Sequence, residues 1–116
     1  MCIRDSYIGG REICNRLFWE NVKPGTGAFD PENMLIYMTG PTTATGIPTG
    51  GRSVFTGISP NSLPEQYVWS GIGGWLGAEL KFAGFDGFML EGRAEKPTYI
   101  YIEDGKIQLL PADRCV

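Results

Sequence analysis

The feature of the sequence that most constrains the fold is a long stretch without hydrophobic periodicity, residues 40–51, rich in proline, threonine and glycine. Short apolar segments flank it, residues 34–38 before it and residues 53–57 after it. Their length and their bounding turn residues are typical of β-strands, and the first is apolar enough to predict burial on both faces. Because loops as long as the one between them are usually functional or disordered, residues 40–51 are a first candidate for a site.

Two short helices are predicted around this strand–loop–strand unit. Residues 11–21 place apolar side chains near one face at helical spacing and stop before Pro24-Gly25. Residues 73–82 form the second predicted helix, after a turn region at residues 59–64. Its apolar stripe consists of Ile72, Trp75, Leu76 and Leu80.

Glycines crowd the start of this second predicted helix, at positions 71, 73, 74 and 77. Glycine costs about 1 kcal/mol per helical position relative to alanine, so another effect has to favour it. Two explanations remain open: a close approach of the backbone to a ligand, or tight packing of the helix on a sheet.

The last third of the sequence predicts three strands, at residues 87–91, 98–103 and 106–110. Asp104-Gly105 joins the last two and is typical of a tight hairpin turn. We therefore expect an α+β fold, with a β-sheet base, two short helices and an antiparallel element at its end.

Cysteine and histidine usage argues against a metal site made by this chain alone. The sequence has no histidine, and its cysteines, Cys2, Cys14 and Cys115, form no Cys-x-x-Cys pair. We predict no metal ligand among these residues, and free buried thiols in a reducing compartment.

Charge and hydropathy exclude other classes. A net charge of −3 leaves no basic surplus for a nucleic acid, and no apolar run approaches the roughly 20 residues of a membrane span. No secretory signal opens the chain, so we expect a cytoplasmic protein. Residues 1–6 read neither as a strand nor as a capped helix; we interpret them as a non-native or disordered start and residues 7–116 as one partial domain.

Two glycine-rich segments could bind an anion. Gly50 and Gly51 precede Arg52 at the end of the long loop, and Gly73 and Gly74 belong to the second glycine cluster. Glycine lets backbone N–H groups approach an anion, and arginine offers a fixed fork of donors. Taken alone, Arg52 is more often an exposed residue after a turn. Arg11, which follows Gly9-Gly10, is a further candidate anion contact, although a surface arginine early in a helix is more common.

Several blocks, in order and spacing, resemble the N-terminal domain of the aldehyde:ferredoxin oxidoreductase family. They are Pro31-Glu32-Asn33, Thr39-Gly40-Pro41, Pro48-Thr49-Gly50-Gly51-Arg52, residues 77–87 and residues 92–104. The resemblance extends from Tyr7 to the end of the sequence. It identifies the chain as an N-terminal piece of a larger enzyme, inactive by itself.

The resemblance implies a β-sheet base that supports tungsten or molybdenum held by two pterins. A [4Fe–4S] cluster lies close by, bound mainly by residues outside this fragment, and Arg52 lies between pterin and cluster. The implied enzyme oxidises or reduces an aldehyde or oxo group, or an aromatic acyl-coenzyme A. Its implied partners are the remaining domains of the full-length chain, a ferredoxin or other iron–sulfur carrier, and further subunits in a homo- or hetero-oligomer. The alternative is a cofactor-free structural or interaction module of the same fold.

One position departs from the family pattern. In the archaeal aldehyde oxidoreductases an asparagine contributes to a magnesium ion that bridges the pterin phosphates, and Gly71 occupies the matching position here. Ser70 or a backbone carbonyl would have to replace that contact. Residues 53–75 resemble the tungsten subunit of anaerobic benzoyl-coenzyme A reductases more than a simple aldehyde oxidoreductase.

Overall fold

The computed structural model describes residues 7–112. The elements in chain order are α2 (Gly10–Asn21), β1 (Met34–Thr39), β2 (Ser53–Ser59), β3 (Gln66–Ile72), α3 (Leu76–Phe82), β4 (Gly87–Glu91), β5 (Thr98–Glu103) and β6 (Lys106–Pro111). Residues 1–6, interpreted above as a non-native start, lie outside the described part of the chain.

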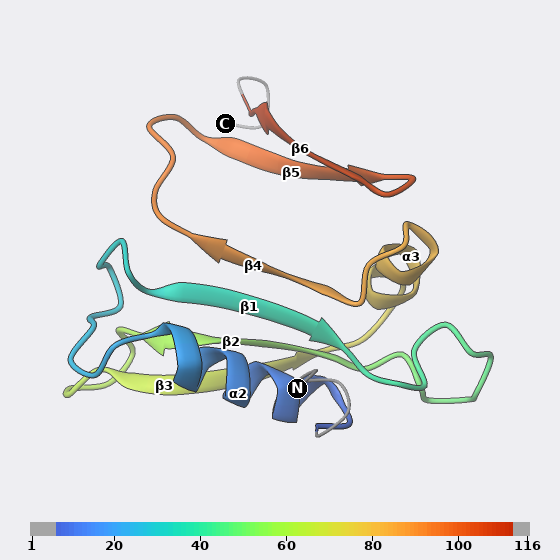
Figure 1. The fold of residues 1–116 in the computed structure, drawn as a ribbon, viewed down its shortest axis with the longest axis horizontal. Coiled ribbons are helices and arrows are strands. Elements are labelled where there is room, and N and C mark those ends of the chain that lie inside the picture. Colours follow the sequence, from blue (N-terminus) through green and yellow to red (C-terminus); the bar gives the residue numbers. More distant parts are fainter. Residues whose placement is uncertain (1–6, 113–116) are drawn as a thin grey trace.

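Four strands form one antiparallel sheet in the order β3-β2-β1-β4 (Figure 1). Thr56 of β2 lies opposite Ile36 of β1 and also opposite Trp69 of β3. Because alternate residues of a strand point to opposite faces, this register places these three side chains on one face of the sheet. β3 is the outer strand on one side, and all of its residues are exposed.

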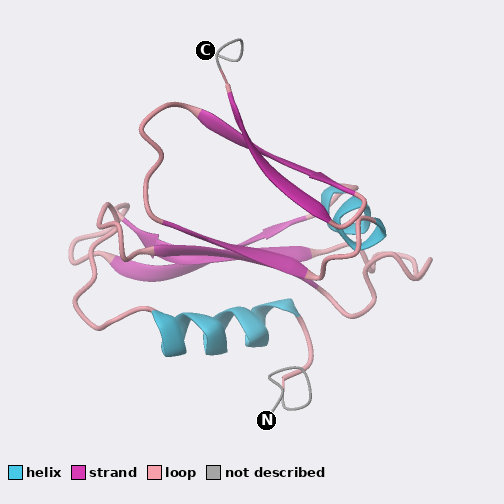
Figure 2. Ribbon diagram, turned by 45° about the horizontal axis from the view of Figure 1, so that its top comes forward, coloured by secondary structure: helices cyan, strands magenta, loops and turns pink. Residues whose placement is uncertain are grey.

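Helix α2 covers that face and buries the main core (Figure 2). Cys14 and Val22 pack against Met34 and Ile36, and Cys14 and Ile36 are fully buried. The flanking apolar side chains are Leu17, Phe18, Met38 and Ile58. Full burial of one such aliphatic side chain contributes about 1.5–3 kcal/mol, so this layer is the main source of stability in the described part.

Aromatic rings occupy the opposite face of the sheet. The Tyr37 ring lies 4.5 Å from that of Phe55 and 5.0 Å from that of Phe88. Helix α3 and the two-stranded β5–β6 sheet lie on this side (Figure 2). Gly77 permits the close contact of α3, because a Cβ there would collide with the side-chain oxygen of Ser53.

The β5–β6 hairpin turns at the dipeptide predicted to make it. Asp104 and Gly105 both have positive φ, 44° and 77°, as a two-residue turn of type I′ requires. The Gly105 N–H donates a hydrogen bond of 2.8 Å to the carbonyl of Ala83, which ties the turn to the end of α3.

The structure confirms the α+β class, the first helix and the strands predicted at both flanks of the long loop and in the last third. Strand β3 was not predicted, and the predicted start of the second helix was wrong. Residues 66–72 form β3, and the second helix begins at Leu76, not at residue 73, because Gly74 has φ +87°, which a right-handed helix cannot contain.

Two smaller predictions also need correction. Strand β1 is not buried throughout, since Leu35 is 43% exposed. The predicted apolar stripe of the second helix is not buried as a unit: Ile72 belongs to β3, Trp75 is 77% exposed, and Leu80 is its one buried member. Within residues 7–112, no helix combines the length and the apolar character needed to cross a bilayer.

Candidate functional site

The long loop of residues 40–51 is folded on itself and fixes the position of the residues that follow it. Thr43 is only 1% exposed. Its hydroxyl accepts a hydrogen bond from the Gly40 N–H (3.2 Å) and donates one to the carbonyl of Gly50 (3.1 Å). A threonine therefore closes the loop, and the segment leading to Arg52 is held in one place.

This loop approaches other backbone closely at two glycines, and the first of them, Gly50, leaves no room for a side chain. A Cβ on Gly50 would stand 2.9 Å from the carbonyl oxygen of Thr42, closer than side chains tolerate. A Cβ on Gly51 would stand 3.5 Å from the carbonyl oxygen of Gly74. The two glycine clusters of the sequence thus meet in space, where the loop enters β2 and where the chain leaves β3.

The side chain of Arg52 lies across Gly71 of β3. Its Nη1 atom is 3.1 Å, and its Cδ atom 3.6 Å, from the point where a Cβ of Gly71 would stand. Arg52 is exposed, in line with the surface position expected for a lone arginine after a turn. No described carboxylate forms an ion pair with it.

A second arginine reaches the same part of β3 from the first turn of α2. The guanidinium carbon of Arg11 lies 4.9 Å from the ring centre of Trp69, a cation–π contact. Trp69 and Gly71 are two residues apart on one strand, so they face the same side at a spacing of about 7 Å. The structure therefore places Arg11 and Arg52 at neighbouring positions on the α2 side of the sheet.

The other predicted residues lie around this pair. Gly73 and Gly74 form the exposed turn after β3, and a Cβ on either would meet nothing within 4 Å. Ser70 lies between Trp69 and Gly71 and faces the opposite side of the sheet, by strand alternation. Ser70 and Arg52 therefore do not line one surface. We name the set Gly50, Gly51, Arg52, Gly71, Gly73 and Gly74 the glycine edge.

The glycine edge has the chemistry to hold an anion. It combines a guanidinium, exposed backbone and a neighbouring second guanidinium, with no acidic partner among the described residues. Among residues 7–112, no three His, Cys, Asp or Glu gather closely enough to bind a metal ion. The edge thus fits the anionic parts of the pterin cofactor implied above, while offering no ligand set for its metal.

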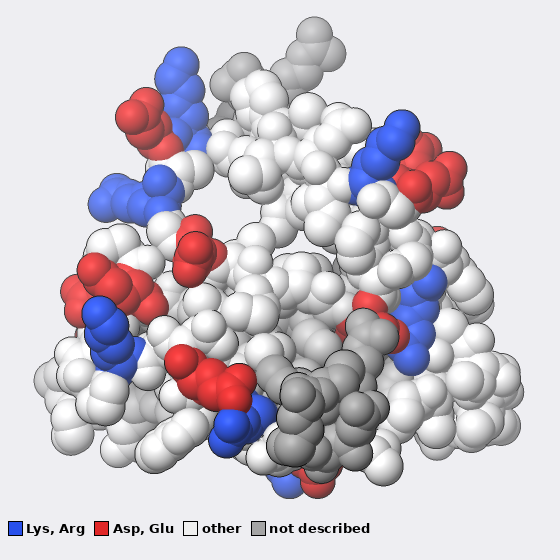
Figure 3. Space-filling view, viewed as in Figure 1, with Lys and Arg blue, Asp and Glu red and all other residues white. Residues whose placement is uncertain are grey.

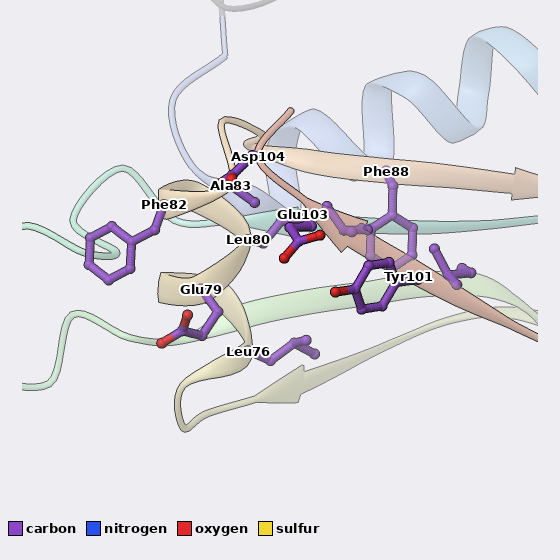
Figure 4. A pocket seen from close by; sticks show the side chains of 11 residues that line it. Leu76, Glu79, Leu80, Phe82, Ala83, Phe88, Tyr101, Glu103 and Asp104 are labelled. Atoms are coloured by element: carbon purple, nitrogen blue, oxygen red, sulfur yellow. The ribbon is translucent and has the colours of Figure 1, made fainter. Parts of the chain in front are cut away.

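A cavity of about 530 Å³ lies elsewhere, between α3, Phe88 and β5. Figure 4 shows Phe88 and Tyr101 among the side chains that line it. Its charged lining is acidic: Glu79, Glu103 and Asp104. The Glu103 carboxylate raises the pKa of the Tyr101 phenol, another sign of negative potential. This cavity is unsuited to an anionic ligand.

Two groups beneath α2 have shifted pKa values for a structural reason. Burial raises the pKa of the Cys14 thiol to about 11, and the thiol donates a weak hydrogen bond to the carbonyl of Val54 (3.9 Å). Burial also raises the pKa of Tyr67, whose hydroxyl donates a hydrogen bond to the side-chain oxygen of Asn15. A thiol that stays protonated is a poor nucleophile, so Cys14 is a core residue.

Sequence reasoning did not find Trp69, the platform for Arg11. The signal was present, since Tyr67, Val68 and Trp69 are residues that favour β-strands. Assigning the following glycines to a helix concealed the strand. On the face shown in Figure 3, basic and acidic side chains are interspersed without a basic patch.

Comparison with known protein families gives one match that spans almost the whole chain. The model of the aldehyde ferredoxin oxidoreductase N-terminal domain matches residues 2–116.

Similar proteins agree with this match. A tungsten-containing aldehyde ferredoxin oxidoreductase from Pyrococcus furiosus is 41% identical over 106 residues, which are 91% of this chain and 17% of that protein. The WOR-like subunit of an aliphatic sulfonate oxidoreductase from the same organism is 32% identical, again over 17% of its length. The chain therefore spans about one sixth of these relatives.

Among solved structures, a chain of the active-site complex BamBC of benzoyl coenzyme A reductase, determined with 1,5-dienoyl-CoA, superposes with a TM-score of 0.90. The superposition covers 97% of this chain and 17% of that one, at 28% identity. Both subfamilies suggested by the sequence, the aldehyde oxidoreductases and the benzoyl-coenzyme A reductases, are thus represented among the similar proteins. The aldehyde enzyme has the higher overall identity (41%), whereas the benzoyl-coenzyme A reductase chain matches in fold over 97% of this chain.

Proposed function

The chain belongs to the aldehyde ferredoxin oxidoreductase family, as its N-terminal domain, and from this premise we propose that it supports the tungsten- or molybdenum-pterin cofactor of a larger oxidoreductase. The observation that carries the proposal is the glycine edge. Its glycines bring loop and strand backbone together, and its one side-chain cation, Arg52, has no acidic partner in the described part of the chain.

The residues of the domain bind and orient; they do not react. The fork of N–H donors on Arg52 suits a phosphate or the polar edge of a pterin ring, and its fixed charge favours an anion beside it. Gly51 and Gly74 leave the backbone accessible at the same point. No group of the described part is placed as a general base, so the domain contributes position and electrostatics.

The remaining chemistry comes from outside these residues. When bound, the metal–pterin group supplies the redox step on an aldehyde, oxo or aromatic acyl-coenzyme A substrate. We propose that a [4Fe–4S] cluster, ligated by later domains, connects the site to a ferredoxin or another iron–sulfur carrier. Arg52 would then act on that cluster through its charge, which raises a reduction potential when it lies close by.

The experiment is metal and pterin analysis of the full-length protein that carries this domain, purified without oxygen. We expect tungsten or molybdenum near one atom per chain, with iron near four, as one [4Fe–4S] cluster requires. Arg52→Ala should reduce the amount of bound pterin and lower the potential of the cluster. Arg16→Ala is the matched control, because Arg16 pairs with Glu20 on the exposed side of α2.

The same experiment distinguishes this proposal from the alternative, a module without a cofactor. If a folded full-length protein contained neither metal nor pterin, the domain would be a cofactor-free structural or interaction module of the same fold. If the metals were present and Arg52→Ala changed neither pterin content nor potential, the glycine edge would not be the support.

A further inference from the structure

The contact between Arg52 and Gly71 constrains which side chains position 71 can hold. Three atoms of Arg52 lie within 4 Å of the point where a Cβ would stand: Nη1 at 3.1 Å, Cδ at 3.6 Å and Cγ at 3.9 Å. The arginine therefore lies along the strand over this glycine. A branched side chain at position 71 would occupy the same volume and would have to displace the guanidinium.

The charge at this point is positive and unbalanced. Arg11 lies over Trp69, on the same face and two residues along β3. The carboxylates that form ion pairs in the described part, Glu20 and Asp86, do so with Arg16 and Lys81. Two guanidinium groups at neighbouring positions repel each other, and an anion between or beside them removes that cost.

The side chains at the same place do not suit a divalent cation. Magnesium takes oxygen ligands, usually including one or two carboxylates. Position 71 carries no side-chain oxygen, Ser70 faces the opposite side of the sheet, and the nearest side-chain atom to position 71 is the cationic Nη1 of Arg52. No side chain of these residues therefore makes the magnesium contact implied by the family resemblance; only backbone carbonyl oxygens remain for it, beside a guanidinium that repels a metal ion.

We propose that Gly71 is a specificity-determining residue, which selects the guanidinium of Arg52 in place of a divalent metal ion as the cation for the phosphate groups of the ligand at the glycine edge. The inference rests on the proposed function, because the phosphate groups meant are those of the pterin cofactor. Gly71 acts by positioning Arg52. Arg11, seated on Trp69, supplies the second positive charge.

The test uses the full-length protein with its cofactor, purified without oxygen. Magnesium, tungsten and molybdenum are measured by mass spectrometry, and the bound pterin is measured before and after gel filtration in EDTA. We expect one pterin-bound metal site per chain, magnesium far below that amount, and no loss of pterin in EDTA. Stoichiometric magnesium, with release of pterin by EDTA, would overturn the inference and leave the proposed function intact.

Variants test the role of position 71. Gly71→Val should reduce bound pterin as much as Arg52→Ala does, because the branched side chain displaces the guanidinium. The control Gln66→Val places the same valine side chain at an exposed position on the other face of β3. It should leave the pterin content unchanged. Full pterin content in a folded Gly71→Val protein would contradict the inference.

A smaller change covers the case in which Gly71→Val does not fold. Gly71→Ala adds one carbon 3.1 Å from the mobile end of Arg52, which can shift by a few tenths of an ångström. We expect this variant to fold and to release pterin faster than the wild type on dilution. An unchanged release rate would count against the positioning role. Absence of tungsten, molybdenum and pterin from every protein would instead contradict the proposed function itself.

Discussion

The two faces of the four-stranded sheet differ in how completely this chain covers them. Under α2, Cys14 and Ile36 are fully buried and one cluster of side chains fills the space. On the opposite side of the sheet, large apolar side chains stay in contact with solvent: Val68 of β3 (43% exposed), Trp75 before α3 (77%) and Leu109 of β6 (68%). The first face is closed where α2 packs on it and open only along β3, where Trp69 is 52% exposed, whereas the second face is covered less completely within the described residues.

This difference separates stability from function within one small domain. The α2 layer holds the sheet together, whereas the exposed face and the glycine edge have the character of surfaces that bind something else. The chain spans about one sixth of its relatives. The remaining domains of the full-length protein are therefore the proposed cover for the apolar side chains.

The largest effect on stability is expected for a substitution in the core beneath α2. Ile36→Ala removes a fully buried side chain from the centre of the sheet and should lower the free energy of unfolding by about 2–5 kcal/mol. Urea denaturation of residues 1–116, followed by circular dichroism, measures the change. A loss below 1 kcal/mol would mean that this face is not packed as described.

An intermediate effect on stability is expected when the pH is raised and the Cys14 thiol ionises. The pKa of Cys14 is raised from 9.0 to about 11 in the folded protein, so the unfolded chain releases the thiol proton first as pH rises. The protonated thiol makes its full contribution to the free energy of unfolding below pH 9. As pH rises toward 11 this contribution is lost, and the free energy of unfolding falls by up to about 3 kcal/mol.

Urea midpoints at pH 8 to 11 test this expectation. In the Cys14→Ala variant the urea midpoint should fall less steeply with pH than in the wild type. It should still fall, because the pKa of Tyr67 is also raised in the folded protein and its ionisation lowers stability in the same way. An identical decline in the variant and the wild type would show that the thiol is not buried.

The smallest effect is expected on the uncovered face. Val68→Thr keeps the branched shape of an exposed residue on β3 and should change the stability of residues 1–116 by no more than about 0.5 kcal/mol. The same substitution should cost more in the full-length protein, where we propose that this face is covered. If Val68→Thr changed the stability of neither residues 1–116 nor the full-length protein, this face would not be covered in the full-length protein.

The elements that depend on local signals were predictable from the sequence. Pro24-Gly25 marks the end of α2, and Asp104-Gly105 specifies the hairpin turn through its two positive φ angles. The strands beside the long loop follow from their apolar composition. In each case a few neighbouring residues determine the backbone conformation.

The arrangement of the site was predictable only in part. The glycines and Arg52 were identified as candidates, but β3 was not recognised, because Ile72 was counted in the apolar stripe of a helix that was predicted to begin at Gly73. Without that strand, the register with β2 is unknown, and register decides that Arg52 lies over Gly71 and that Ser70 faces away. Such pairings join residues far apart in sequence, which local patterns do not specify.

The glycine edge is the proposed place of the anionic cofactor in the full-length protein. A crystal structure of the full-length protein, with anomalous data at a tungsten absorption edge, locates the metal and the pterin phosphates directly. We predict the pterin against Gly51 and Gly74, with a phosphate within hydrogen-bonding distance of the Arg52 guanidinium. A pterin bound away from this edge, for example over the acidic cavity beside α3, would contradict the claim.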